Sequence, residues 1–190
     1  MRRSLILATV TCAGSMLASG ISNAGAVSDT YRGGAFGLPW NAGKSAIEAK
    51  FPGGNWDEDG KGHARYCVTN KQTLLKLPPP HQTKELCMLI GTDGTLASVT
   101  AVMEPSLMAL LAVVNRCRTT FGDFDAVVRD ESAIQSRSNG MLWTADKPYV
   151  VQVESQNNEV GSPTRVAFTV ADEAHLYTEG SKKVSSRPGS

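Results

Sequence analysis

Residues 85–103 read ELCMLIGTDGTLASVTAVM, two apolar runs separated by the turn Thr92-Asp93-Gly94. Asp-Gly between two apolar runs is a strong signal for a tight β-hairpin. The stretch therefore predicts two antiparallel strands, at 85–90 and 96–103. We take this hairpin as the centre of the fold and work outward from it.

A short helix is predicted upstream, over 44–51. Ile47 and Phe51 lie four residues apart on one face of such a helix, and Asn41 precedes it as a candidate N-cap. Pro52-Gly53 then ends it, because proline cannot continue a helix and glycine readily leaves one.

A second helix is predicted downstream, from Pro105 to Phe121. Proline suits the first helical position, and Gly122 supplies a left-handed cap at the other end. The apolar residues between them follow the three-and-four spacing of a helix face turned to a core: Leu107, Leu110, Leu111, Val114, Cys117 and Phe121.

Further strand-like segments occur before and after this unit. They lie at 64–70 with an extension at 74–77, and at 140–144, 149–154 and 165–170, whereas 55–62 reads as a charged loop. Antiparallel strands punctuated by two helices predict an α+β fold with about six strands and both helices on one sheet face. The order suggests a duplicated α-β-β-β layout, with the other sheet face partly open for binding.

The first residues have the three parts of a signal peptide. Arg2 and Arg3 form a positive start, an apolar run covers 5–17, and small residues end at Ala24 and Ala26. We expect cleavage after Ala24 or Ala26. The domain plan is thus a signal peptide at 1–26, a single α+β domain at 27–177 and a disordered tail at 178–190, rich in Gly, Ser, Lys and Pro.

The composition is that of an ordinary globular protein. Of 190 residues, 19 are basic and 18 acidic, for a formal net charge of +1. Loss of the two signal-peptide arginines leaves 17 basic residues against the 18 acidic ones. This balance gives no support to nucleic-acid binding, and no membrane insertion is expected after signal cleavage. The chain has no Asn-x-Ser/Thr sequon, so a bacterial periplasmic or secreted protein is the expected product.

Export would place Cys67, Cys87 and Cys117 in an oxidising compartment, where one bridge can form and one thiol is left over. Cys67 and Cys87 lie in neighbouring strand-like segments and are the favoured pair. A bridge from Cys117 to either is the alternative. On the predicted helix face, Cys117 behaves as a small buried hydrophobe, whereas a catalytic thiolate would need an electropositive and partly exposed setting.

The segment Gly37-Leu38-Pro39-Trp40-Asn41 and the helix-forming residues up to Phe51 resemble the opening of many small exported bacterial proteins. The element order is similar to that of the beta-lactamase-inhibitor-like and small outer-membrane-assembly lipoprotein families. That resemblance implies a module that binds other proteins through a sheet face or its loops. The chain lacks the lipid-anchor cysteine of the assembly lipoproteins.

No catalytic or metal-binding motif stands out. The histidines His63, His81 and His175 are scattered and form no HExxH pair, and the mature chain has neither a GxSxG nor a GxxxxGK[ST] loop. The acidic turn at 57–60 lacks the ligand pattern of a calcium loop. No cofactor and no metal site are expected.

Two segments are candidates for recognition. Asn55-Trp56-Asp57 offers an aromatic side chain beside acids, and the segment 77–81, with Pro79 and His81, is held extended by its prolines. The favoured interpretation of the prolines themselves is that they only stop a strand edge from pairing with neighbours.

The sequence thus predicts an exported, non-enzymatic protein-binding module with tentative binding residues Trp56, Asp57, Pro79 and His81. An inhibitor, immunity or envelope-assembly protein would be a special case. The alternative is a small secreted hydrolase whose carboxylate or thiol site assembles only in the fold.

Overall fold

The computed structural model describes residues 26–78, 81–130, 137–145, 148–157, 161–172 and 183–186. Three helices lie within these ranges: α1 (Ala26–Tyr31), α2 (Lys44–Lys50) and α3 (Leu107–Phe121). The strands are β1 (Asn55–Glu58), β2 (Ala64–Thr69), β3 (Thr83–Ile90), β4 (Leu96–Met103), β5 (Ala126–Asp130), β6 (Arg137–Trp143), β7 (Tyr149–Asn157), β8 (Pro163–Asp172) and β9 (Lys183–Ser186).

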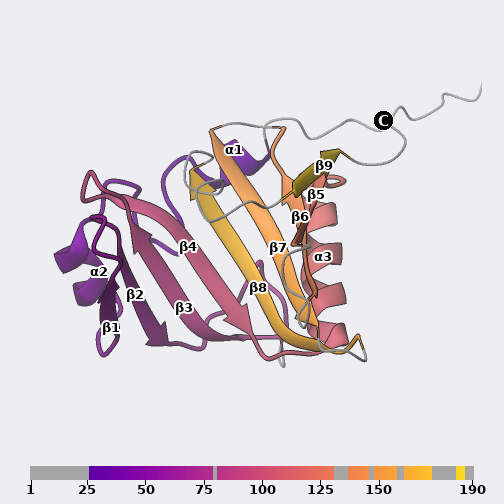
Figure 1. The fold of residues 1–190 in the computed structure, drawn as a ribbon, viewed down its shortest axis with the longest axis horizontal. Helices are drawn as coiled ribbons and strands as arrows, with labels where there is room; N and C mark the ends of the chain where they lie inside the picture. Colours follow the sequence, from indigo (N-terminus) through magenta and orange to yellow (C-terminus); the bar gives the residue numbers. More distant parts are fainter. Residues whose placement is uncertain are drawn as a thin grey trace, which may run out of the picture.

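All of these strands join one antiparallel sheet in the order β1-β2-β3-β4-β8-β7-β6-β5-β9 (Figure 1). The α+β class is therefore correct, but the prediction of about six strands is wrong. The additional strands include β1, which lies in the expected charged loop, and β5, which lies in a polar stretch. Both are near the ends of the sheet, where a strand needs no fully apolar face.

The element order repeats, as predicted, but with four strands instead of three. Helix α2 is followed by the meander β1 to β4, and α3 is followed by the meander β5 to β8. The two meanders meet where the last strand of each, β4 and β8, pair antiparallel over 98–103 and 166–171. The sheet is thus made of two similar halves joined last strand to last strand.

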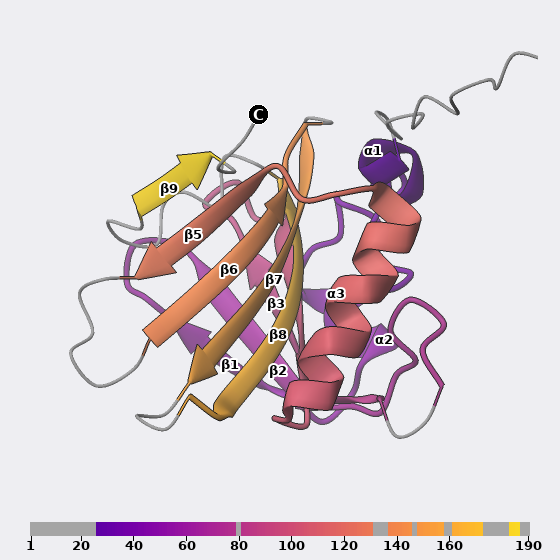
Figure 2. The ribbon, with the colours of Figure 1, turned by 90° about the vertical axis from the view of Figure 1, so that its right-hand side faces the viewer.

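The helices gather on one side of this sheet (Figure 2). Strand alternation turns one row of each strand toward them, including the fully buried Met88, Val99, Phe168 and Val170. The helices contribute Ile47 and, from α3, Val113 and the residues Val114, Cys117 and Phe121 of the predicted face, and both halves of the sheet share this one core. The predicted α3 face is wrong in its first turns, where Leu107 and Leu111 are exposed. The opposite face carries a smaller cluster of Ala126, Val128 and Leu142.

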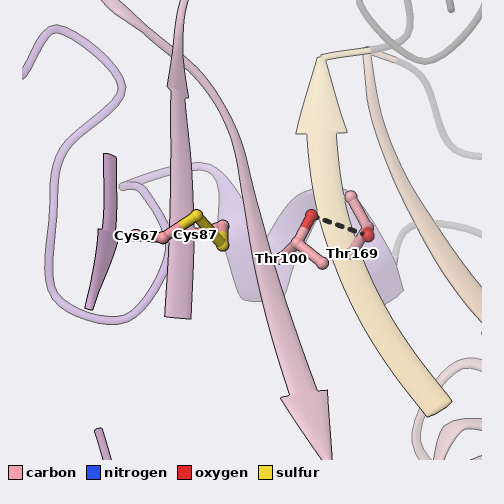
Figure 3. Close-up of a disulfide and its surroundings, with 4 residues drawn as sticks. All are labelled: Cys67, Cys87, Thr100 and Thr169. Carbon is pink, nitrogen blue, oxygen red and sulfur yellow. Dashed lines mark hydrogen bonds between the residues drawn. A yellow bond between two sulfur atoms is a disulfide. The ribbon is translucent and has the colours of Figure 1, made fainter. Parts of the chain in front are cut away.

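The opposite sheet face also holds the disulfide. Cys67 pairs in register with Cys87, Cys87 with Thr100, and Thr100 with Thr169, so the four side chains form a row across β2, β3, β4 and β8 (Figure 3). The two threonine hydroxyls are 3.0 Å apart and hydrogen-bonded. The predicted Cys67–Cys87 bridge is confirmed.

Several local predictions need correction. The N-cap of α2 is Gly43, not Asn41, and no side chain caps it. Helix α3 begins after Ser106, whose side chain accepts a hydrogen bond from the Ala109 amide, so Pro105 precedes the cap instead of opening the helix. The segment 74–77 is not a strand, because Leu75 and Lys76 have positive φ.

The chain ends are described only in part. Residues 1–25 lie outside the described residues, so the signal peptide at 1–26 and its cleavage sites stay predictions. Within the expected tail at 178–190, residues 183–186 form β9, which pairs with β5. For the remaining tail residues, which lie outside the described ranges, disorder stays a prediction.

The bridge between Cys67 and Cys87 has a testable effect on stability. Because it closes a loop with a sequence separation of 20, its removal in a Cys67→Ser/Cys87→Ser variant should lower the free energy of unfolding by about 3 kcal/mol. Urea unfolding monitored by circular dichroism measures this. A loss below about 1 kcal/mol would show that the bridge constrains the unfolded chain far less than loop entropy requires.

Candidate functional site

The strongest candidate site lies where α2 stands over the edge strand β1, a region we call the β1 corner: α2, β1 and the loop 59–63. Trp56 is its centre. The Trp56 indole Nε1 donates a 2.6 Å hydrogen bond to Oε1 of Glu48, and its ring packs against Tyr66 with centroids 4.9 Å apart. The side chain is partly exposed, so the corner presents an aromatic surface in a fixed orientation.

A cation covers the same indole. Nζ of Lys44 lies 5.1 Å from the centroid of the Trp56 ring and also forms an ion pair with the Glu58 carboxylate. Lys44 and Glu48 are one helical turn apart on α2, while Trp56 and Glu58 are two residues apart on β1 and share a sheet face. The periodicities of a helix and a strand thus bring the four side chains together.

Tyr66 ties the corner to the core. Its ring is 2% exposed. Its hydroxyl donates to the Phe51 carbonyl at 2.7 Å and accepts from the Gly54 amide at 2.8 Å. A Cβ at residue 54 would lie 2.5 Å from Cζ of Tyr66, so the close approach requires glycine. One hydroxyl therefore fixes the end of α2 and the entry to β1.

The loop 59–63 is organised by Asp59. Its carboxylate accepts hydrogen bonds from the amides of Lys61 (2.7 Å) and His63 (3.1 Å) and from Nδ1 of His63 (2.9 Å). These bonds, the Lys61 amide first, lower the pKa of the Asp59 carboxyl. Asp59 therefore holds the loop 59–63 together, and the hydrogen bonds that it accepts favour its ionised form.

An open cleft of about 330 Å³ lies beside the corner, between the loop 59–63 and the turn 91–95. Lys44 and Glu58 contribute its charged side chains, His63 adds an imidazole ring, and glycines make up much of the remaining wall. Lys44 pairs with Glu58, and the His63 ring is hydrogen-bonded to Asp59. These polar side chains therefore already have partners within the corner.

The tentative binding residues do not form one site. Trp56 and Asp57 are consecutive on β1, so their side chains point to opposite sheet faces; Asp57 lies opposite Arg65 of β2. His81 is half-buried in the connection 70–82, which joins β2 to β3 at the end away from the loop 59–63. Pro79 lies outside the described residues.

Sequence reasoning missed Lys44, Glu48 and the Asp59–His63 pair. The sequence shows the i,i+4 spacing of Lys44 and Glu48, but it predicts a charged loop at 55–62, where β1 carries their partners. The spacing of Asp59 and His63 around Gly60 and Gly62 was also visible. Neither spacing shows by itself which side chains of other elements these residues will contact.

The cysteines that the structure describes offer neither a reactive thiol nor a metal ligand. Cys117 is free and fully buried on α3, and burial raises the pKa of its thiol. Glu85 lies close to Cys67 and Cys87, but sulfurs joined in a disulfide have no thiolate to offer a metal.

A second exposed feature lies on α3. Leu107, Met108 and Leu111 are 58%, 66% and 46% exposed, and they are the exposed large hydrophobic residues of the described chain. They occupy the first turns of α3, which lies at the opposite side of the sheet from α2 and β1 (Figure 1). They provide a second surface against which the corner can be compared.

Comparison with protein-family models, curated proteins and solved structures finds no match. The resemblance noted above therefore rests on the segment 37–51 and the element order alone. None of the helices in the described ranges is long and apolar enough to cross a membrane.

The Tyr66 hydroxyl should be needed for stability. A Tyr66→Phe variant leaves the Phe51 carbonyl and the Gly54 amide without their partner, which should lower the free energy of unfolding by about 1–2 kcal/mol. Tyr149→Phe is the matched control, expected within about 0.5 kcal/mol of the original because its ring still stacks on Trp40. Equal losses in the two variants would contradict the role of the Tyr66 hydroxyl.

Thiol labelling tests the state of the cysteines. At pH 8 in the native protein, Cys67, Cys87 and Cys117 should resist an aromatic disulfide reagent, because two are bridged and the third is buried with a raised pKa. Unfolding without reductant should release one reactive thiol among them. Rapid labelling of Cys117 in the folded protein would contradict its burial and revive a thiol mechanism.

Proposed function

We propose that this chain is an exported, non-enzymatic protein-binding module that presents the β1 corner to its partner. The observation that carries the proposal is the indole of Trp56, partly exposed yet held by Glu48, Lys44 and Tyr66. Aromatic side chains fixed on a rigid frame are frequent anchors of protein interfaces, because little rotational freedom is lost when they dock.

The elements that hold β1 in place support this interpretation. β1 pairs with β2 along its whole length. Asn55 of β1 lies opposite Cys67 of β2, and the disulfide joins Cys67 to Cys87 of β3. Tyr66 fixes the start of β1 to the end of α2 through two hydrogen bonds. The Trp56 side chain thus projects from a strand that is fixed along its length by β2 and at its start by Tyr66.

Export is part of the proposal. The predicted signal peptide would direct the chain to the periplasm or the exterior, and the Cys67–Cys87 bridge is compatible with an oxidising compartment. An inhibitor, immunity or envelope-assembly protein would be a special case of such a module.

The chemistry argues against the hydrolase alternative. A thiol nucleophile needs a lowered pKa and access to substrate, whereas Cys117 is buried and its thiol pKa is raised. A carboxyl group acting as general acid at neutral pH needs a raised pKa, whereas that of Asp59 is lowered by the bonds that organise its loop.

The test is capture of the partner followed by a binding titration. The exported protein is cross-linked in its native envelope, the dominant partner is identified by mass spectrometry, and its affinity is then measured with purified components. Trp56→Ala should weaken that affinity by about tenfold or more, as expected for an interface anchor.

Met108→Ala, on the exposed part of α3, is the control and should leave the affinity nearly unchanged. Retention of full affinity by Trp56→Ala would contradict the β1 corner as the binding surface. No reproducible partner in repeated captures would contradict the binding function and direct the search to hydrolase substrates.

A further inference from the structure

We propose that the partner adds an extended segment to the sheet alongside β1, pairing with the main chain of Trp56 and Glu58 and placing a basic residue against Asp57. This inference rests on the proposed function and names how the β1 corner binds. It follows from the hydrogen-bonding pattern of the first strands.

The pattern is set by the disulfide pair. The Cα atoms of Cys67 and Cys87 are 4.1 Å apart, the close spacing of a pair that exchanges no main-chain hydrogen bonds. The 3.1 Å bond from the Asn70 amide, directly after the end of β2, to the Lys84 carbonyl agrees with this alternation. The main-chain groups of Cys67 therefore face β1, not β3.

The alternation continues across β1. Asn55 is the register partner of Cys67, and Asp57 that of Arg65, so Asn55 and Asp57 bond inward to β2. The Asp59 amide then donates to the His63 carbonyl at 3.2 Å, two residues further on. The N–H and C=O groups of Trp56 and Glu58 must consequently point away from the sheet.

This outer side is open within the part of the chain that the structure describes. β1 is the first strand in the sheet order, and no hydrogen bond from a described residue reaches the main chain of Trp56 or Glu58. Unpaired edge groups are a template for another strand, and extended peptides bind many domains in this way.

The side chains of β1 define the chemistry of the incoming segment. If Trp56 and Glu58 exchange the hydrogen bonds of an antiparallel pairing, Asp57 occupies the close pair between them. Asp57 is exposed, so a lysine or arginine opposite it is favoured and an acidic residue is disfavoured. On the other face, an apolar residue can pack against the partly exposed indole.

A second copy of this chain is a poorer occupant. Two-fold antiparallel pairing of β1 with itself, with Trp56 opposite Glu58, would put Asp57 directly opposite Asp57. Pairing with Glu58 opposite Glu58 also opposes like charges, which destabilises a cross-strand pair. Pairing with Trp56 opposite Trp56 sets Asp57 against Asn55 of the second copy, which offers Asp57 no cation. A basic segment of another protein avoids the like charges and supplies the cation.

The probe is an acetylated and amidated octapeptide of alternating lysine and valine, titrated into the isotope-labelled exported protein and followed by nuclear magnetic resonance. We expect slower hydrogen exchange at the Trp56 and Glu58 amides on binding. An octapeptide of alternating glutamate and valine should bind at least about tenfold more weakly, because it sets acids against Asp57.

Two variants of one residue isolate the main-chain contact. Glu58→Pro removes an outward donor without removing a bond to β2, whereas Glu58→Ala removes the same carboxylate and keeps the donor. The proline variant should bind the lysine-valine peptide about tenfold more weakly than the alanine variant. Equal binding by the two variants would overturn strand addition.

Asp57→Asn keeps the inference testable if the proline variant does not fold, and it sets no like charge against Arg65, the register partner of Asp57 on β2. It should lose most of the preference for the lysine-valine peptide over the glutamate-valine peptide, because the charge facing the incoming strand is removed. An unchanged preference would overturn the basic segment as partner. In either case, loss of the captured partner in Trp56→Ala would still support the β1 corner, so the two proposals can fail separately.

Discussion

The antiparallel pairing of β4 with β8 joins the two meanders into one sheet. Residues 98–103 and 166–171 form this seam, and its core side is filled by residues with essentially no exposure, such as Val99, Phe168 and Val170. Without it, the sheet would divide into one part of four strands, β1 to β4, and one of five, β5 to β9, each with two open edges and only part of a core. On the opposite face the hydroxyls of Thr100 and Thr169 bond across the same seam. The helices α2 and α3 can cover a common core only because the halves meet here.

Because β4 and β8 pair in the middle of the sheet, its unpaired strand edges lie only at its two ends. One outer strand, β1, is short and carries acids, features by which proteins limit uncontrolled edge pairing. Yet β1 is also held firmly, by β2 on one side and by Tyr66 and α2 beneath it. A short, rigid and charged edge disfavours association with arbitrary strands while remaining able to accept one of matching chemistry. Binding at the β1 corner is therefore consistent with the way the fold distributes its unpaired backbone.

The parts of this structure that the sequence predicted are those with local signals. Asp93-Gly94 between two alternating runs predicted the β3–β4 hairpin, and the spacing of Val114, Cys117 and Phe121 predicted the buried face of the second half of α3. The same spacing failed at Leu107 and Leu111, which are exposed because the first turns of α3 do not bury that face. β1 was missed because an edge strand packed on one side needs no apolar alternation, and Asn55 to Glu58 shows none. That omission also placed Trp56 and Asp57 in one loop site, although strand geometry sends them to opposite faces. The contacts of Trp56 with Lys44 and Glu48 depend on how α2 settles over β1, which only tertiary packing decides.

The central claim is that β1 is an ordered edge whose outward peptide groups are free to bind. Amide hydrogen exchange in the unliganded exported protein tests it most directly, because free amides exchange quickly and ladder amides do not. The account predicts that the Asn55 and Asp57 amides exchange on the order of a hundredfold more slowly than those of Trp56 and Glu58. Strong protection at Trp56 and Glu58 would show that the edge is already covered. Rapid exchange at all four residues would show that β1 is not held as a strand, and either result would contradict the account.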